Sequence, residues 1–231
     1  PERPDIVAHV AQFENHQVGA DDSQGLFNVN TISALRLLEY AKKSGAKKFI
    51  LFSTGGTYEP SRDLITENSP LRAKDLNPYI ASKLAGETAA ASYASCLELI
   101  IFRPFFLYGP GQRQNMLIPR LVKSVAEGLP VKVPGKEGSR LNPLFVEDAA
   151  EATAAALSLS GTHTINLAGP ETISIRGIAK IIGGLLGKTP IFEETAAPAD
   201  DYVADIAKMK SLLRPPVVTA AEGLKKTITH C

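Results

Sequence analysis

The chain has 231 residues, of which 44% are hydrophobic and 21% charged, and its formal net charge is +1 at pH 7. This length can bury a sizeable core and fits one large domain or one and a half. The near-neutral charge argues against nucleic acid or a membrane surface as the main partner, and no apolar run approaches the roughly 18 residues that a membrane helix needs.

The first half alternates between short apolar runs and helical patterns with one apolar face. Gly45 stands where a helix C-cap takes a left-handed residue. The predicted elements are a strand within 5–11, a helix over 23–44, a strand over 48–52, a helix over 79–95 and a strand over 97–102. This order predicts an α/β protein whose parallel strands carry helices on both faces, that is, a doubly wound parallel sheet.

The second half is less regular, and its pattern predicts a mixture of helices and short strands. Ser174 has the residue type that caps a helix N-terminus. The predicted elements are a helix over 117–128, a strand over 131–133, a helix over 147–160, a strand over 163–167, a helix up to 186 and a helix over 219–228.

Cysteine and histidine usage indicates a reduced, metal-free protein. Cys96 and Cys231 are far apart and form no Cys-x-x-Cys pattern, which favours free thiols and a cytoplasmic location. No signal peptide is visible, although the chain begins at Pro1. The histidines show no metal-ligand spacing, so we expect no metal site. They are His9, His16, His163 and His230.

Tyr79 and Lys83 are the first candidates for chemistry. Residues four apart on a helix are neighbours on one face, so both side chains can point into the same cleft. A free tyrosine has a pKa near 10, and a nearby ammonium lowers that pKa by favouring the phenolate. Tyr79 would then act as a general acid or base on a substrate hydroxyl. The alternative is a surface tyrosine and lysine with no function, because a Tyr-x-x-x-Lys match is frequent by chance.

Thr54 follows the strand predicted over 48–52. Ligands of open α/β sheets bind at the carboxyl ends of the strands, where this hydroxyl lies. We expect Thr54 to bind the same substrate oxygen as Tyr79. A threonine that only satisfies the backbone of a turn is the other interpretation.

Seven motifs stand in a fixed order along nearly the whole chain. Together they resemble the extended short-chain dehydrogenases/reductases, specifically the NAD-dependent sugar-nucleotide epimerases/dehydratases. They are DIVAHVA at 5–11, Asn30 followed by LLE at 37–39, FSTGGTY at 52–58, NPYIASKLAGE at 77–87, RPFFLYGPGQ at 103–112, FVED at 145–148 and ADIAK at 204–208.

The resemblance implies a Rossmann-type sheet and an activity. Residues 1–112 would be the dinucleotide-binding domain, and residues 113–231 mainly a substrate-binding domain, with about 141–170 returning to the sheet. The cofactor would be NAD, with NADP not excluded, and the substrate a nucleotide-sugar. The reaction would be a transient oxidation of a sugar carbon, with hydride passing to the cofactor and back onto the other face of a keto-sugar.

The resemblance also assigns roles to single residues. Tyr79 would be the catalytic acid/base, Lys83 would tune it and hold the nicotinamide ribose, and Thr54 would bind the reacting hydroxyl. The cofactor-binding residues would be His9, Val10, Ala11, Asn30, Ser53, Tyr79, Lys83, Pro104, Phe106 and Leu107. The substrate-binding residues would be Thr54, Gly55, Phe106, Arg113 and Arg140.

The chain departs from the family pattern at several positions. No glycine-rich turn of the pyrophosphate-binding type is present, and the family's first three strands would precede Pro1, so we expect a fragment. Gly55 and Gly56 stand where dehydratases carry an Asp-Glu pair, which disfavours dehydration. Phe106 replaces an asparagine and cannot donate its hydrogen bond, and Arg140 is shifted from the usual arrangement.

Three functions remain open from the sequence. The first is a nucleotide-sugar epimerase. The second is a reductase or dehydrogenase on the same scaffold, which would show net cofactor turnover. The third is a binding protein that keeps the fold without the chemistry. We also expect a homodimer that pairs through the helices over 23–44 and 79–95.

Overall fold

The computed structural model describes residues 3–13, 23–61 and 63–229, so His16, His230 and Cys231 lie outside the described residues. The chain divides into two compact units. The first comprises residues 1–59, 67–104 and 154–166, and the second comprises 60–66, 105–153 and 167–231. Each unit is a separate body in the description below.

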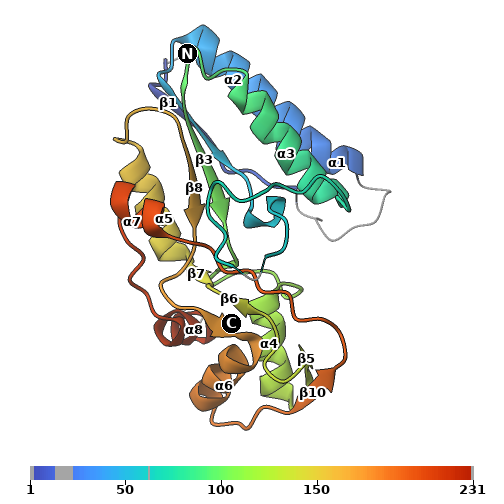
Figure 1. Ribbon diagram of the computed structural model, residues 1–231. Coiled ribbons are helices and arrows are strands. Elements are labelled where there is room, and N and C mark those ends of the chain that lie inside the picture. The colour runs from blue at the N-terminus through green and yellow to red at the C-terminus, as the bar shows by residue number, and fades with distance from the viewer. Residues whose placement is uncertain (1–2, 14–22, 62, 230–231) are drawn as a thin grey trace. The chain divides into compact units, whose positions relative to one another are not determined.

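The first unit is built on a four-stranded sheet with the order β1-β2-β3-β8 (Figure 1). The strands are β1 (Ile6–His9), β2 (Lys48–Phe52), β3 (Glu98–Pro104) and β8 (His163–Leu167). β2 runs parallel to both β1 and β3, and the register pairs His9 with Leu51 and Phe52 with Phe102. The residues that follow β1 and β2 therefore emerge at the same carboxyl edge.

One long helical segment and one further helix pack on this sheet. The segment predicted over 23–44 is helical throughout, as α1 (Ser23–Phe27), a π-helical turn η2 (Asn28–Ile32) and α2 (Ser33–Ser44). It ends at Gly45, whose φ of 78° is the left-handed C-cap that the sequence predicts. Leu38 and Ala41 of α2 join Phe49 and Leu99 of the sheet in one apolar core.

The other helix of this unit, α3 (Pro78–Ala91), begins with a standard N-terminal arrangement. The Asn77 side chain accepts a hydrogen bond from the backbone of Ile80, and Pro78 occupies the first helical position, where it loses no hydrogen bond. α3 ends at Ala91, four residues before the predicted end. Gly86 lies against η2, and a Cβ atom there would come within 2.8 Å of the Asn30 carbonyl oxygen.

The second unit has helices around a separate apolar core, with three pairs of short strands. The core includes Ile118, Leu121, Val133, Phe145 and Ile178. The helices are α4 (Leu117–Glu127), α5 (Val146–Ala156, whose last turn belongs to the first unit), α6 (Ile175–Leu186), α7 (Ala207–Leu212) and α8 (Ala220–Ile228). The strand pairs are β4 (Leu107–Tyr108) with β7 (Leu144–Phe145), β5 (Val131–Pro134) with β10 (Phe192–Thr195), and β6 (Arg140–Leu141) with β9 (Ile173–Ser174).

The pattern of the sequence locates the longer elements of this unit and misses the shorter ones. Ser174 caps α6 through the backbone of Gly177, as expected. The helix predicted over 147–160 ends at Ala156. β10 was not predicted because its sequence Phe-Glu-Glu-Thr carries two adjacent glutamates and no apolar alternation. The six-residue α7 and the two-residue strands are too short to produce a periodic signal.

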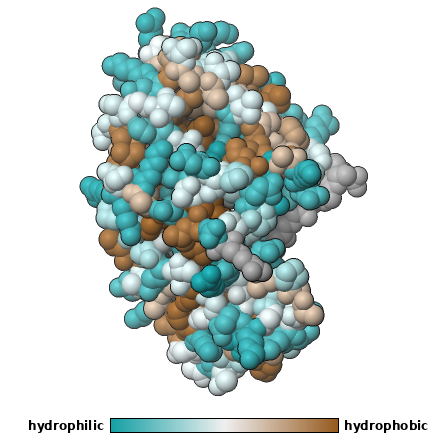
Figure 2. Space-filling view, viewed as in Figure 1, coloured by the Kyte–Doolittle hydropathy of each residue, from teal (hydrophilic) through white to brown (hydrophobic). Residues whose placement is uncertain are grey.

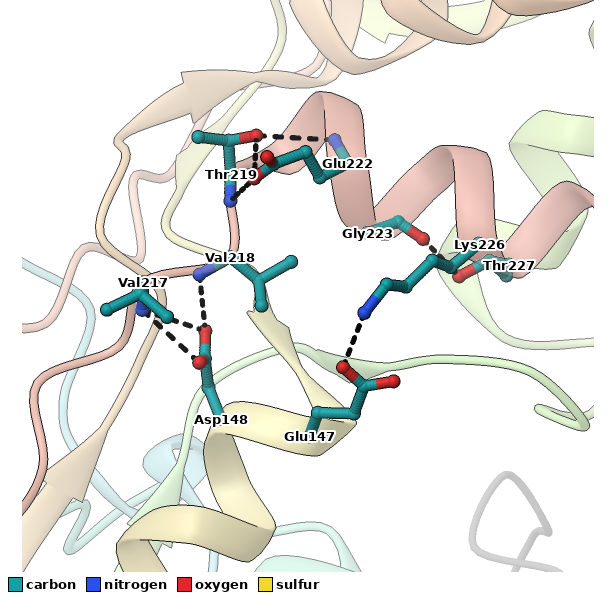
Figure 3. Close-up of polar contacts among 9 residues, drawn as sticks. All are labelled: Glu147, Asp148, Val217, Val218, Thr219, Glu222, Gly223, Lys226 and Thr227. Carbon is teal, nitrogen blue, oxygen red and sulfur yellow. Dashed lines mark hydrogen bonds and ion pairs between the residues drawn. The ribbon is translucent and has the colours of Figure 1, made fainter.

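Asp148, in the motif FVED at 145–148, fastens the segment before α8. Its buried carboxylate accepts hydrogen bonds from the backbone nitrogens of Val217 and Val218, the latter at 2.9 Å (Figure 3). Thr219 and Glu222 then form a reciprocal capping box at the start of α8. The carboxylate satisfies donors that would otherwise be buried unpaired, so this motif residue has a structural role here.

The surface mixes hydrophilic and hydrophobic residues. On the face drawn in Figure 2, hydrophobic residues are interspersed with hydrophilic ones. None of the helices in the described part of the chain is long and apolar enough to cross a membrane. Cys96 is a free, exposed thiol, as the sequence predicts.

Candidate active site

Thr54 stands at the carboxyl edge of β2 and organises the turn that follows. It caps the short 3₁₀ turn η3 (Gly55–Thr57), where its hydroxyl accepts a hydrogen bond from the backbone of Gly56 at 3.2 Å. Its carbonyl accepts the hydroxyl of Thr57 at 2.8 Å. The turn-forming role and the predicted substrate role of Thr54 therefore coexist, because the same hydroxyl also bonds Tyr79.

Tyr79 lies in the first turn of α3, with its phenol near the end of β2. A side-chain hydrogen bond joins it to Thr54. The phenol also donates to the Gln12 side chain at 3.5 Å, the outer limit for a hydrogen bond. The sequence does not predict a role for Gln12 at the site, although it directly follows the predicted cofactor residues 9–11. The structure thus brings together Tyr79 and Thr54, as predicted.

Lys83 lies one helical turn beyond Tyr79 and points to the same strand end. Its ammonium donates to the backbone carbonyl of Phe52 at 2.8 Å, and the residue is only 4% exposed. Burial disfavours the charged form and lowers the pKa of Lys83 from 10.5 to about 8, against the opposing field of Glu87. The expected placement of both side chains toward the carboxyl edge of the sheet is therefore found.

The expected effect on the tyrosine is not found. The sequence predicts that Lys83 lowers the pKa of Tyr79. In the structure burial raises the pKa of Tyr79, and the opposing contribution comes from the hydrogen bond with Thr54. Desolvation of a phenolate outweighs the neighbouring groups, and the lysine ammonium is directed to the Phe52 carbonyl. Tyr79 is thus held as a neutral phenol that can donate a proton.

Three predicted cofactor residues of the first unit carry buried polar atoms that have no partner within the described part of the chain. These atoms are His9 Nδ1, Asn30 Oδ1 and Ser53 Oγ. His9 bonds Ser33 through its other ring nitrogen at 2.6 Å, and its pKa is lowered by burial and then by Lys83, which favours the neutral ring. An unpaired buried polar group costs about 1–3 kcal/mol. Such atoms, together with a buried ammonium, fit residues that hold the polar ribose and amide groups of a dinucleotide.

The π-helical turn η2 is fastened to α3 immediately beside Lys83. Asn30 donates to the Ser82 hydroxyl at 2.9 Å, and Thr31 donates to the Ser82 carbonyl at 2.8 Å. Single π turns inside α-helices are frequent at functional sites. Asn30 is 1% exposed, so its side chain serves this contact more directly than any contact with a ligand. No periodic signal in the sequence distinguishes this turn from regular helix.

Val10 and Ala11 follow β1 and are exposed, and Pro104 ends β3. The other predicted ligand residues belong to the second unit. Phe106 is 37% exposed and has a φ of 45°, which is rare and strained for a bulky residue. Its ring meets the ring of Tyr202 edge to face at a centroid distance of 6.5 Å.

The two arginines predicted for the substrate diphosphate differ in their surroundings. Arg140 forms a bidentate ion pair with Asp201, with nitrogen to oxygen distances of 2.7 and 2.9 Å. Its guanidinium already has a carboxylate partner, so a phosphate would have to compete with Asp201. Arg113 is exposed in the loop before α4, and Leu107 lies in β4.

Comparison with known proteins resolves the family. The sequence model of the NAD dependent epimerase/dehydratase family matches residues 1–168. The chain belongs to this family. The family match and the likeness to an NAD-bound structure confirm two predictions: the cofactor NAD and the doubly wound α/β sheet.

Two curated relatives and one solved structure illustrate the likeness. UDP-glucuronate 4-epimerase of Thermodesulfobacterium geofontis is 32% identical, over 96% of this chain and 71% of the relative. dTDP-D-glucose 4,6-dehydratase of Mus musculus is 29% identical, over 98% of this chain and 67% of the relative. The crystal structure of UDP-glucuronic acid 4-epimerase from Bacillus cereus in complex with NAD is 28% identical, with a TM-score of 0.86 over 98% of this chain and 73% of that one.

Proposed function

We propose that this protein is an NAD-dependent epimerase that acts on a nucleotide-sugar, with UDP-sugars as the first class to test. The observation that carries the proposal is the grouping of Thr54, Tyr79 and Lys83 at the carboxyl end of β2, in a chain of the NAD dependent epimerase/dehydratase family. The similarity to UDP-glucuronate 4-epimerase supports the choice of substrate class.

Each of the three residues has a distinct part in the proposed chemistry. Bound NAD supplies the hydride acceptor and donor. In its phenolate form Tyr79 takes the proton of the sugar hydroxyl as the carbon is oxidised, and the resulting phenol returns that proton when the keto-sugar is reduced on its other face. Thr54 holds the reacting oxygen through its hydroxyl, and the buried Lys83 ammonium binds the nicotinamide ribose.

Epimerisation is favoured over dehydration by the residues that follow Thr54. Elimination of water from the sugar needs an acid and a base beside the reacting carbons, and Gly55 and Gly56 provide no such group. In the structure both glycines belong to η3, and the backbone of Gly56 is bonded to the Thr54 hydroxyl. The turn therefore serves to position Thr54.

The contribution of the second unit to substrate binding is also part of the proposal. Phe106 in its strained conformation presents an aromatic ring where a polar residue is usual in the family, so we assign it to contact with an apolar surface of the nucleotide-sugar. Arg113 and Arg140 are the proposed diphosphate ligands, with Asp201 as the group that phosphate must displace from Arg140.

The proposed assembly is a homodimer. Ile32 and Tyr40, on the helical segment of η2 and α2, are large hydrophobic residues that are 39% and 43% exposed. Their burial against a second copy would stabilise a pair. Light scattering at micromolar concentration should give twice the monomer mass, and a monomer at that concentration would contradict the pairing.

The decisive experiment supplies NAD and a panel of UDP-, GDP-, CDP- and dTDP-sugars to the protein expressed from its complete coding sequence. We expect inversion at one sugar carbon, measured by NMR, with no net change in the redox state of the cofactor. Net formation of reduced cofactor would instead establish a dehydrogenase. Loss of water from the sugar would establish a dehydratase. A folded protein that binds a sugar nucleotide without turnover would establish a binding protein.

A further inference from the structure

A buried ion pair connects α3 to β3 in the first unit. Glu87 accepts hydrogen bonds from Arg103 through both carboxylate oxygens, at 3.1 Å from Nε and 2.5 Å from a terminal nitrogen. The two side chains are 7% and 8% exposed. This geometry fixes the carboxylate in position and orientation, because both of its oxygens are engaged by one planar guanidinium.

The arginine of this pair is itself held by two further residues. Its remaining terminal nitrogen donates to the Tyr58 hydroxyl at 2.8 Å, and that hydroxyl donates to the Asn166 side chain at 2.8 Å. The guanidinium carbon also lies 4.7 Å from the centre of the Tyr58 ring. The network spans α3, β3, the end of η3 and β8, so Glu87 cannot move independently of the sheet.

Glu87 is four residues beyond Lys83 and therefore lies on the same face of α3. Both residues are buried, and Glu87 is the group whose field opposes the loss of the proton from Lys83. The other titratable groups near the ammonium are Tyr79 on α3 and His9 on β1, whose own pKa is lowered by the charge of Lys83. Ser82 and Asn30 line the neighbouring contact with η2 and carry no charge.

A buried ion pair is weak evidence for stability alone, because the desolvation of two charges offsets most of their attraction. The pair has a second effect at this position. Glu87 stands on the same face of α3 as Lys83, so the carboxylate that Arg103 fixes in place also acts on the lysine. The field at the lysine thus depends on the charge of Glu87.

We propose that Glu87 is a positioning residue, whose carboxylate is locked by Arg103 and keeps Lys83 as an ammonium ion against the Phe52 carbonyl. The inference deepens the proposed function, on which it rests for the part that Lys83 plays in proton transfer. It assigns a purpose to a buried pair that the sequence did not reveal, because Glu87 and Arg103 are 16 residues apart and show no pattern.

The test is a titration of Lys83 followed by NMR of ¹³C-labelled lysine side chains, with the Lys83 signal assigned from its loss in Lys83→Met. We expect Glu87→Gln to lower the midpoint by about one pH unit, because the buried carboxylate that opposes the loss of the Lys83 proton is removed. The double variant Glu87→Gln/Arg103→Gln also lacks the carboxylate, so its midpoint should lie below the wild-type value as well. Glu151→Gln removes one exposed carboxylate and should leave it unchanged.

The outcome separates an electrostatic role from a purely structural one. A midpoint that is the same in wild type and in folded Glu87→Gln would overturn the proposal, whatever the loss of thermal stability. If Glu87→Gln does not fold, the double variant and Arg103→Gln decide. Arg103→Gln should raise the midpoint relative to the double variant, and equal midpoints would overturn the proposal. The titration needs no substrate. Its result therefore tests the role of Glu87 separately from the proposed epimerase activity, and either proposal can fail while the other holds.

Discussion

Two ion pairs, one in each unit, differ in how far their side chains are exposed. In the first unit Glu87 and Arg103 form a pair that is less than a tenth exposed, beside a buried lysine. In the second unit the ion pair of Arg214 with Glu151 has side chains that are 71% and 57% exposed. Exposed pairs contribute little to stability, whereas the members of a buried pair depend on each other. The first unit therefore carries an ion pair whose desolvation is costly, beside the proposed catalytic lysine.

Buried polar atoms without a partner among the described residues occur in both units, three in the first and Gln112 Oε1 in the second. In the second unit the carboxylate of Asp148 accepts hydrogen bonds from the backbone of the segment that precedes α8 (Figure 3). In the first unit His9, Asn30 and Ser53 each retain one buried polar atom with no partner among the described residues. Such atoms indicate a surface prepared for another molecule. The three atoms of the first unit support the cofactor site that we propose there.

The largest expected effect comes from removing the proposed acid/base. Tyr79→Phe keeps the ring in place and removes only the hydroxyl, so we expect epimerisation to fall by about 100- to 10,000-fold. Tyr40→Phe changes an exposed tyrosine of α2 and is the matched control. Rates are measured by the appearance of the inverted sugar, with circular dichroism to verify the fold. Wild-type activity in Tyr79→Phe would remove the tyrosine from the mechanism.

The next largest effect is the loss of stability when the buried ion pair is broken, compared with the loss when the exposed ion pair is broken. Arg103→Met leaves the Glu87 carboxylate buried without its cation and should lower the free energy of unfolding by about 3–5 kcal/mol. Arg214→Met breaks an exposed pair and should cost at most about 1 kcal/mol. Both values come from urea denaturation at pH 7. Equal losses in the two variants would abolish the distinction between the units.

Lys83→Met should stabilise the protein. The lowering of the lysine pKa from 10.5 to about 8 corresponds to a burial cost of about 3 kcal/mol at neutral pH. Loss of the hydrogen bond to the Phe52 carbonyl returns about 1–2 kcal/mol of that, so the free energy of unfolding should rise by about 1–2 kcal/mol. Lys47→Met, at an exposed lysine before β2, is the control.

The smallest effect is the pH dependence of that gain. The unfolded chain keeps the Lys83 proton up to about pH 10.4, whereas the folded chain releases it near pH 8, so wild-type stability gains from this residue as pH rises between these values. Lys83→Met lacks this dependence. The difference in free energy of unfolding between the two proteins should therefore narrow from pH 7 to pH 10. A constant difference would mean that folding does not lower the pKa of Lys83.

The sequence was sufficient for the architecture and for the central residues of the site. Alternating apolar runs and helical patterns located β2 and β8 to the residue, and the glycine at position 45 located the end of α2. Thr54, Tyr79 and Lys83 could be found because their spacing and their positions after a strand and at the start of a helix carry the signal. These are local features, and local features are what sequence periodicity reports.

What could not be predicted depends on contacts between distant segments. The direction of the Tyr79 pKa follows from how deeply the phenol is buried, which the spacing of two residues does not specify. The Glu87 and Arg103 pair and the approach of Gln12 to Tyr79 join residues far apart in the chain. The π turn at Asn28–Ile32 arises where a helix must fit against α3, and its residues look helical.

Gly86 allows α3 to approach the π-helical turn η2 closely, because its side chain is only a hydrogen atom. A methyl group there would meet the Asn30 carbonyl oxygen and force the backbones apart. Because Lys83 is less than one turn away on the same rigid rod, that separation would draw its nitrogen off the strand end it now touches. Replacement of Gly86 by alanine, which adds one methyl group and no reactive group, would therefore disturb the proposed catalytic lysine through the backbone alone.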